Sequence, residues 1–197
     1  MEFIIATNNK KKLREMGAIL GKLGVRALSL AEAGIESDAK ETGTTFEENS
    51  RIKALAAMRV AKLPAIADDS GLEVDALGGE PGVYSARYGG DKCRDDVERY
   101  EYLLENMKNV PDGERQARFV SVITCVFPDG REISARGEIE GEILRAPHGE
   151  GGFGYDPIFF VPDEGMTTAE MTQERKNEIS HRAKSLRIMA EKLEEVL

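Results

Sequence analysis

Short apolar runs that alternate with amphipathic stretches constrain this chain more than any other feature. The runs at residues 3–6 (FIIA), 25–30 (VRALSL) and 65–67 (AIA) have the length and composition of strands. Between them, residues 11–23 carry leucine and methionine at helical spacing, and residues 44–63 form a longer helical pattern. Alternating strands and helices are typical of an α/β fold.

The later sequence adds antiparallel elements to this pattern. Residues 118–143 predict a hairpin that turns at PDGR, and a further strand is predicted over residues 156–162. Amphipathic helices are predicted over residues 95–107 and 180–197. We therefore expect a mixed sheet, with the antiparallel ribbon forming or extending a second lobe.

Two local signals define the ends of the helix at residues 44–63. Thr44 followed by Glu47 matches a capping box and predicts its start. Pro64 ends the helix and opens the next strand.

Composition limits the class of protein. The 197 residues suit one domain over residues 1–197, and a hydrophobic content of 41% is enough for a core. The net charge of −9 argues against a general nucleic-acid binder. No run approaches the length of a membrane span, and the N-terminus lacks the pattern of a signal peptide. We expect a cytoplasmic protein in which Cys93 and Cys125 are free thiols.

The first strand runs directly into the polar sequence TNNKKK. Lysines at the start of a helix oppose its dipole, unless an anion binds there. Thr7, Asn9 and Lys12 could donate to such a phosphate, although the P-loop pattern is absent. The alternative is an ordinary strand–helix turn with solvated lysines.

A second candidate site is acidic. Asp68 and Asp69 follow the apolar strand, and Glu41 lies in the sequence AKETGTTF. Adjacent strand residues point to opposite faces, so both aspartates serve one site only if the strand ends there and turns at Ser70-Gly71. Such carboxylates hold Mg²⁺ or activate water. The alternative is that one aspartate caps a turn and the other is solvated.

Two further stretches could bind an organic ligand. The glycines of EGGFGYDPIFF let the backbone approach closely, and Phe153 and Tyr155 could stack on a base, with Asp156 beside them. The alternative is a bulge or tight turn with core aromatics. In KNEISHRA, Lys176, His181 and Arg182 form either a polar clamp or a solvated helix face.

Five motifs together carry a family resemblance. The motifs TNNKKK, ETGTTFEENSRIKA, PAIADDSGLEVDALGGEPGVYSARYGG, GGFGYDPIFFVP and ISHR occur in order along nearly the whole chain. The sequence thereby closely resembles the inosine triphosphate pyrophosphatase family. It departs from the family at Asn8, where glycine is frequent.

The resemblance implies an elongated, two-lobed α/β fold with a mixed central sheet flanked by helices and a cleft between the lobes. It implies a homodimer that hydrolyses the aberrant purine nucleotides ITP, dITP, XTP and dXTP to monophosphate and pyrophosphate with Mg²⁺. That reaction would remove these nucleotides from the nucleotide pool.

Site residues carry over by motif. Asp69 would be the general base, and the metal would be held by Glu41, Asp68 and Asp69. Phosphates would be held by Thr7, Asn8, Asn9, Lys10, Lys11, Lys12 and Lys53, and Ser70 would contact substrate. The base would be held by Phe153, Gly154, Tyr155, Asp156, Lys176, His181 and Arg182.

Three rival classes remain open at this stage. A nucleotide sensor would not need the carboxylate set, so the sequence ADDSG disfavours it. A pyrophosphatase of similar architecture acting on modified pyrimidines would differ in its preferred triphosphate. An RNA-binding protein is disfavoured by the charge and by the lack of a basic stripe.

Overall fold

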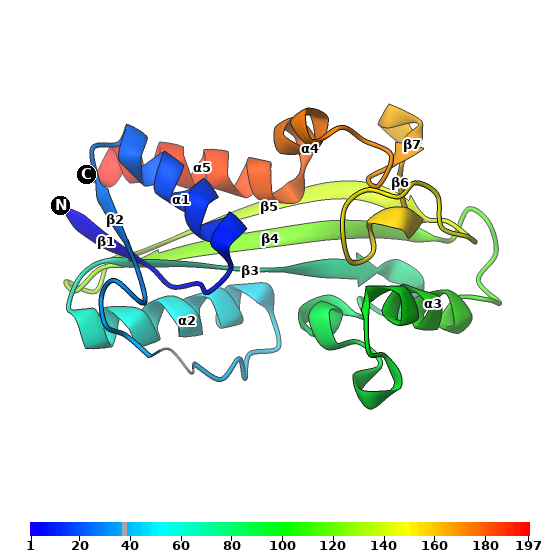
Figure 1. The fold of residues 1–197 in the computed structure, drawn as a ribbon, viewed down its shortest axis with the longest axis horizontal. Coiled ribbons are helices and arrows are strands. Elements are labelled where there is room, and N and C mark those ends of the chain that lie inside the picture. The colour runs from blue at the N-terminus through cyan, green and yellow to red at the C-terminus, as the bar shows by residue number, and fades with distance from the viewer. Residues whose placement is uncertain (37–38) are drawn as a thin grey trace. The chain divides into compact units, whose positions relative to one another are not determined.

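The strands form one seven-stranded mixed sheet in the order β2-β1-β3-β4-β5-β6-β7 (Figure 1). The structure is a computed structural model and describes residues 1–36 and 39–197. The strands are β1 (Glu2–Ile5), β2 (Arg26–Ser29), β3 (Ala65–Val74), β4 (Gln116–Val126), β5 (Glu132–Ile143), β6 (Phe159–Val161) and β7 (Met166–Thr167). The helices are α1 (Lys10–Lys22), α2 (Phe46–Ala61), α3 (Asp96–Asn106), α4 (Gln173–Ile179) and α5 (His181–Val196).

The sheet confirms the predicted α/β class and its mixed character. β1 pairs in parallel with β2 and with β3, whereas β6 pairs antiparallel with β5 and β7. The predicted hairpin is also present, because the backbone N–H of Phe127 donates to the carbonyl of Arg131 at 2.9 Å across the turn between β4 and β5.

One predicted boundary was wrong, and one helix was missed. The strand expected from residue 156 begins at Phe159, because Asp156–Ile158 form a turn of 3₁₀ helix that contains Pro157. The C-terminal helix begins at His181 and is preceded by α4, which the sequence did not predict. Ser180 has extended backbone and separates the two helices.

The chain divides into two compact units. Unit 1 comprises Met1–Ser70, Ser121–Gly137 and Arg182–Leu197, and unit 2 comprises Gly71–Val120 and Glu138–His181. β3, β4 and β5 contribute residues to both units. The single domain, the elongated shape and the cleft stay predictions.

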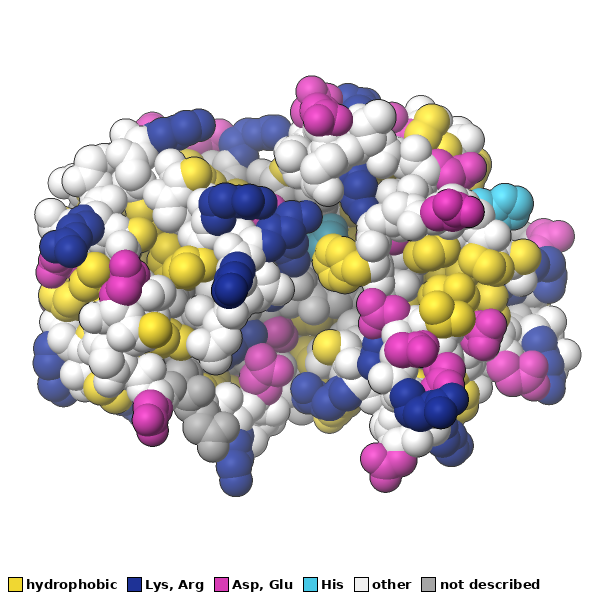
Figure 2. All heavy atoms as spheres, in the orientation of Figure 1, with side chains coloured by type: hydrophobic (Ala, Val, Ile, Leu, Met, Phe, Trp, Pro, Cys, Tyr) yellow, Lys and Arg dark blue, Asp and Glu magenta, His cyan; other side chains and the backbone are white. Residues whose placement is uncertain are grey.

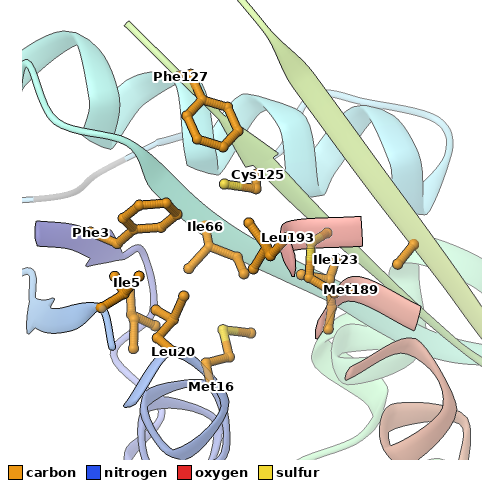
Figure 3. Packing of buried hydrophobic residues seen from close by; sticks show 12 residues of the cluster. Phe3, Ile5, Met16, Leu20, Ile66, Ile123, Cys125, Phe127, Met189 and Leu193 are labelled. Carbon is orange, nitrogen blue, oxygen red and sulfur yellow. The ribbon is translucent and has the colours of Figure 1, made fainter. Parts of the chain in front are cut away.

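In unit 1, helices cover both faces of the sheet (Figure 1). On one face, α1 and α5 pack against the strands through a cluster that includes Ile66, Met16 and Met189 (Figure 3). On the other face, Ala54 and Ala57 of α2 belong to the cluster of Ile4, Ala65 and Ala67. Small side chains let α2 approach the strands closely.

Unit 2 has its own core. Leu72 and Val74 of β3 cluster with Leu103 and Met107 at the end of α3, and with Phe159 of β6. All five side chains are fully buried.

Among the helices of the described residues, none is both long and apolar enough to cross a membrane.

The capping box of α2 lies one residue later than predicted. Thr45 is the N-cap and its hydroxyl accepts from the N–H of Glu48 at 3.1 Å, while the Glu48 carboxylate accepts from the N–H of Thr45 at 3.3 Å. The sequence TTFEE offers both registers, Thr44–Glu47 and Thr45–Glu48. Packing of Phe46, which is buried, accompanies the second register.

We expect Thr45→Ala to lower the free energy of unfolding by about 1 kcal/mol, because it removes the N-cap acceptor. Thr44→Ala is the matched control and should cost less than about 0.5 kcal/mol, since it removes only an exposed hydrogen bond to Glu48 at 3.0 Å and leaves the N-cap acceptor in place. Chemical denaturation measures both. An equal loss for the two variants would contradict the assigned register.

Candidate functional site

The loop after β1 is organised by its own side chains. The Asn9 Oδ1 accepts from the N–H groups of Lys11 at 2.9 Å and Lys12 at 3.2 Å, and thereby caps α1. The Thr7 hydroxyl oxygen accepts from the N–H of Asn9 at 3.2 Å. In the described part of the chain, Lys62 is the one non-glycine residue with positive φ. Asn8 therefore occupies the family's frequent glycine position without left-handed strain.

The first turn of α1 contains lysines and no acidic residue. The Lys12 Nζ lies 2.7 Å from Oδ2 of Asp68, whose side chain is 1% exposed. This carboxylate reaches the helix start from β3 and offsets the unfavourable charge there.

The two aspartates do not end their strand, so the predicted turn at Ser70-Gly71 was wrong. β3 continues to Val74, and alternation along the strand separates the two carboxylates. Asp68 pairs with Lys12 of α1, whereas Asp69 accepts from Lys53 of α2 at 3.0 Å. Both lie beyond the last β1–β3 pair, Ile5 with Ile66, at the carboxyl end of β1.

Lys53 joins two of the predicted carboxylates. Its ammonium donates to Glu41 at 2.8 Å and to Asp69 at 3.0 Å. Burial by itself would lower the pKa of Lys53, but the charge of Asp69 and the hydrogen bond to Glu41 raise it above its ordinary value. Lys53 therefore stays charged at neutral pH.

The neighbouring aspartates differ in acidity. Burial raises the pKa of Asp69 above its ordinary value, and the nearby Lys53 only partly offsets this effect. Burial also acts to raise the pKa of Asp68, but the charges of Lys12 and Arg182 outweigh it and hold that pKa below its ordinary value. Asp69 is thus the better proton acceptor of the two.

Unit 1 contains a pocket of about 290 Å³ where these groups meet. Six predicted site residues line it: Thr7, Asn8, Lys12, Glu41, Lys53 and Asp68. Asp69 does not line the pocket itself, but it accepts a hydrogen bond from Lys53, which does. Outside the residues predicted for the base, five predicted residues do not line the pocket: Asn9, Lys10, Lys11, Asp69 and Ser70.

The carboxylates of this pocket fit a hard divalent cation. Within residues 1–36 and 39–197, no three His, Cys, Asp or Glu side chains form a ready metal cluster. However, Oδ1 of Asp68 and Oδ2 of Asp69 are buried without a hydrogen-bond partner among the described residues, whereas Oδ2 of Asp68 is paired with Lys12. Mg²⁺ usually takes only one or two carboxylates, with water and phosphate oxygens completing its shell.

Unit 2 brings together three of the residues predicted to hold the base. The Asp156 carboxylate accepts from the Lys176 ammonium at 2.8 Å and from the Thr168 hydroxyl at 2.8 Å. The His181 ring stacks on Phe119 with centroids 5.2 Å apart. All five side chains line one small cavity of about 30 Å³. The Asp156–Lys176 ion pair and the His181 ring therefore lie at one cavity.

The two aromatic residues of the glycine-rich loop have different environments. Phe153 is 64% exposed, which suits stacking. Tyr155 is buried in the core of unit 2, and its hydroxyl donates to the Ser85 carbonyl at 2.8 Å. Tyr155 therefore matches the alternative interpretation of a core aromatic.

Arg182 belongs to unit 1 and is not among the residues that line this cavity. Its Nε is 3.9 Å from Oε2 of Glu15, and its charge lowers the pKa of Asp68. Sequence reasoning missed Glu15, although its i, i+3 spacing from Lys12 on α1 was a usable signal. Phe119 and Thr168 had no signal in the sequence.

A model of the Ham1 family matches residues 3–192. The chain belongs to the Ham1 family. A Thermus thermophilus protein named dITP/XTP pyrophosphatase is 52% identical over 191 residues, covering 97% of this chain and 91% of its own length. An Escherichia coli protein of the same name is 48% identical and covers 96% of each chain.

Solved structures agree with this Ham1 assignment. The Staphylococcus aureus Ham1 protein superposes with a TM-score of 0.93 at 41% identity, over 100% of both chains. A Mycobacterium abscessus nucleoside-triphosphatase, also named dITP/XTP pyrophosphatase, has a TM-score of 0.85 at 41% identity, over 96% of this chain and 98% of that one. The fold of this chain is therefore the Ham1 fold.

The opposite pKa shifts predict opposite effects of neutralising each aspartate in the metal-free protein. The raised pKa of Asp69 means that its ionised form costs stability once the pH rises through that pKa. Asp69→Asn should therefore become more stable than the parent protein as the pH rises. The lowered pKa of Asp68 means that its ionised form stabilises the fold, an effect lost as the pH falls through that pKa.

Asp68→Asn is the matched variant, and should be destabilised at neutral pH with a deficit that shrinks in acid. Urea unfolding from acid to neutral pH, in EDTA, measures both free energies of unfolding. Stability differences of the same sign for the two variants would contradict the assignment.

Proposed function

We propose that this Ham1 protein hydrolyses ITP, dITP, XTP and dXTP to the monophosphate and pyrophosphate, removing them from the nucleotide pool. The names of its relatives support the substrate class. The observation that carries the proposal is the pairing in unit 1 of Asp69, a carboxylate of raised pKa, with the ammonium of Lys53 at 3.0 Å. In this proposal the general base, Asp69, is in direct contact with Lys53, the cation that binds phosphate.

In the proposed reaction, water attacks the α-phosphorus and Asp69 takes its proton. A carboxylate of raised pKa is suited to that transfer near neutral pH. Lys12 and Lys53 stabilise the charge that develops on the departing pyrophosphate. Lys53 also fixes the orientation of the Asp69 carboxylate through their hydrogen bond.

We propose Mg²⁺ as the cofactor, held by Glu41, Asp68 and Asp69. Oδ1 of Asp68 and Oδ2 of Asp69, which are buried without a hydrogen-bond partner among the described residues, support this choice. When bound, Mg²⁺ supplies further neutralisation of the triphosphate charge. Lys12 and Lys53, which pair with Asp68 and Asp69, would then be available to bind phosphate.

For the base, we propose that Phe153 stacks on the purine and that Asp156, Lys176 and His181 contact its edge. Hypoxanthine and xanthine have an acceptor oxygen at position six, whereas adenine has an amine donor there. A buried donor aimed at that oxygen is left unpaired by adenine, which can discriminate by about 10⁴–10⁵-fold. Guanine shares the oxygen, so its exclusion depends on its two-amino group.

The family resemblance also supports a homodimer acting in the cytoplasm, which we propose for this chain. A nucleic-acid partner is disfavoured, because basic and acidic side chains are interspersed on the face seen in Figure 2.

Product analysis with ITP and Mg²⁺ tests the reaction. We expect inosine monophosphate and pyrophosphate, and an Asp69→Asn variant slowed by about 10²–10⁴-fold, because it lacks the base. Diphosphate with orthophosphate would overturn the proposal, and no release at all would favour the sensor class. Comparing hydrolysis of ITP with that of modified pyrimidine triphosphates tests the remaining alternative, a pyrophosphatase that acts on modified pyrimidines.

We propose Arg182 as the donor to the six-oxygen, and Arg182→Ala tests this role. We expect the ratio of kcat/KM for ITP to that for ATP to fall, because the donor to the six-oxygen is lost. Equal loss on both nucleotides would contradict base reading and assign Arg182 to Asp68, the carboxylate whose pKa it lowers. Arg14→Ala, an exposed arginine on α1, is the control for a general loss of positive charge.

A further inference from the structure

The loop at residues 149–156 presents an exposed aromatic ring on a backbone with little intrinsic rigidity. Phe153 lies between Gly152 and Gly154, whose φ angles are +81° and +61°. Glycine loses more conformational freedom on ordering than any other residue. The position of the Phe153 ring therefore depends on contacts that hold this backbone.

Two carboxylates make such contacts at consecutive amides. The N–H of Phe153 donates to Oδ2 of Asp156 at 2.9 Å, and the N–H of Gly154 donates to Oδ2 of Asp96 at 2.8 Å. Asp156 belongs to the loop itself. Asp96 is the first residue of α3, so it ties the loop tip to a separate element of unit 2.

Asp96 is well placed to act as a fixed support. Its other oxygen accepts from the guanidinium of Arg99, one turn further along α3. A carboxylate in the first turn of a helix is also stabilised by the helix dipole. The far end of α3 is anchored by Leu103 and Met107, which are fully buried. The Asp96 carboxylate is thus oriented before any ligand binds.

We propose that Asp96 is a positioning residue for base recognition, because its hydrogen bond to Gly154 holds the Phe153 ring where it stacks on the purine. The inference rests on the proposed function, in which Phe153 takes the base. Asp96 itself touches no substrate in this scheme. It reduces the freedom that the loop would otherwise lose on binding.

The first test compares a ligand with a base and one without. Asp96→Ala should weaken binding of inosine monophosphate by about fivefold, the range of one hydrogen bond. Binding of inorganic triphosphate should be unchanged, since it has no base to stack. Asp96→Asn keeps an acceptor oxygen and should restore most of the affinity. For ITP hydrolysis, the KM should rise more than kcat falls.

The second test reads the loop directly and needs no ligand. The chain has no tryptophan, so Phe153→Trp introduces a single reporter at the loop tip. Adding Asp96→Ala to this variant should lower the fluorescence anisotropy of that tryptophan, because its backbone is released. Adding Asp96→Asn should leave the anisotropy near its starting value.

Asp95→Ala is the matched control. Asp95 is the N-cap of α3 and accepts from the N–H of Glu98 at 2.9 Å, so its loss weakens the same helix end without touching Gly154. We expect it to leave both inosine monophosphate affinity and anisotropy near those of the parent.

Three results would overturn the Asp96 role: unchanged anisotropy in Asp96→Ala, equal weakening of both ligands, or the same losses in Asp95→Ala. Failure of the proposed function has a different signature, namely a parent protein that releases no pyrophosphate from ITP. The anisotropy result stands in either case, so the two failures are distinguishable.

Discussion

The candidate site depends on one constraint, the alternation of side chains along β3. Because successive strand residues point to opposite faces, two adjacent carboxylates separate instead of repelling each other at one point. Asp68 meets Lys12 of α1 on one face, and Asp69 meets Lys53 of α2 on the other. The helices that cover the two faces of unit 1 therefore each supply one cation to the same pocket, and the short β1 leaves the end of β3 accessible to it.

This arrangement also gives the two aspartates different acidities. Asp68 has a nearby ammonium and a guanidinium, so it remains ionised, whereas Asp69 shares Lys53 with Glu41 and has its pKa raised by burial. The division suits a permanently charged metal ligand beside a proton acceptor. In the metal-free protein the ionised form of Asp69 costs stability, which is expected of a functional site that is not optimised for stability alone.

Much of the architecture was predictable, because periodicity reports which residues must be buried. The α/β class, the mixed sheet and the hairpin at PDGR followed from apolar spacing and turn residues, and six predicted site residues line one pocket. The errors arose where local signals were ambiguous. TTFEE offers two capping registers, and Ser70-Gly71 permits a turn that the extended β3 does not take. Tyr155 was grouped with Phe153 by sequence, although only one of the two is exposed.

The sequence by itself determined the order of the main strands and helices, although not α4 or β7. It also determined the family resemblance and the residue types available for phosphate, metal and base. These properties depend on composition and short-range spacing, both of which the sequence gives directly. The tertiary structure alone decided which carboxylate meets which lysine, and that Asp96 supports the loop of Phe153. Those contacts join residues far apart in sequence, such as Asp96 and Gly154, and no local pattern encodes a distance across the fold.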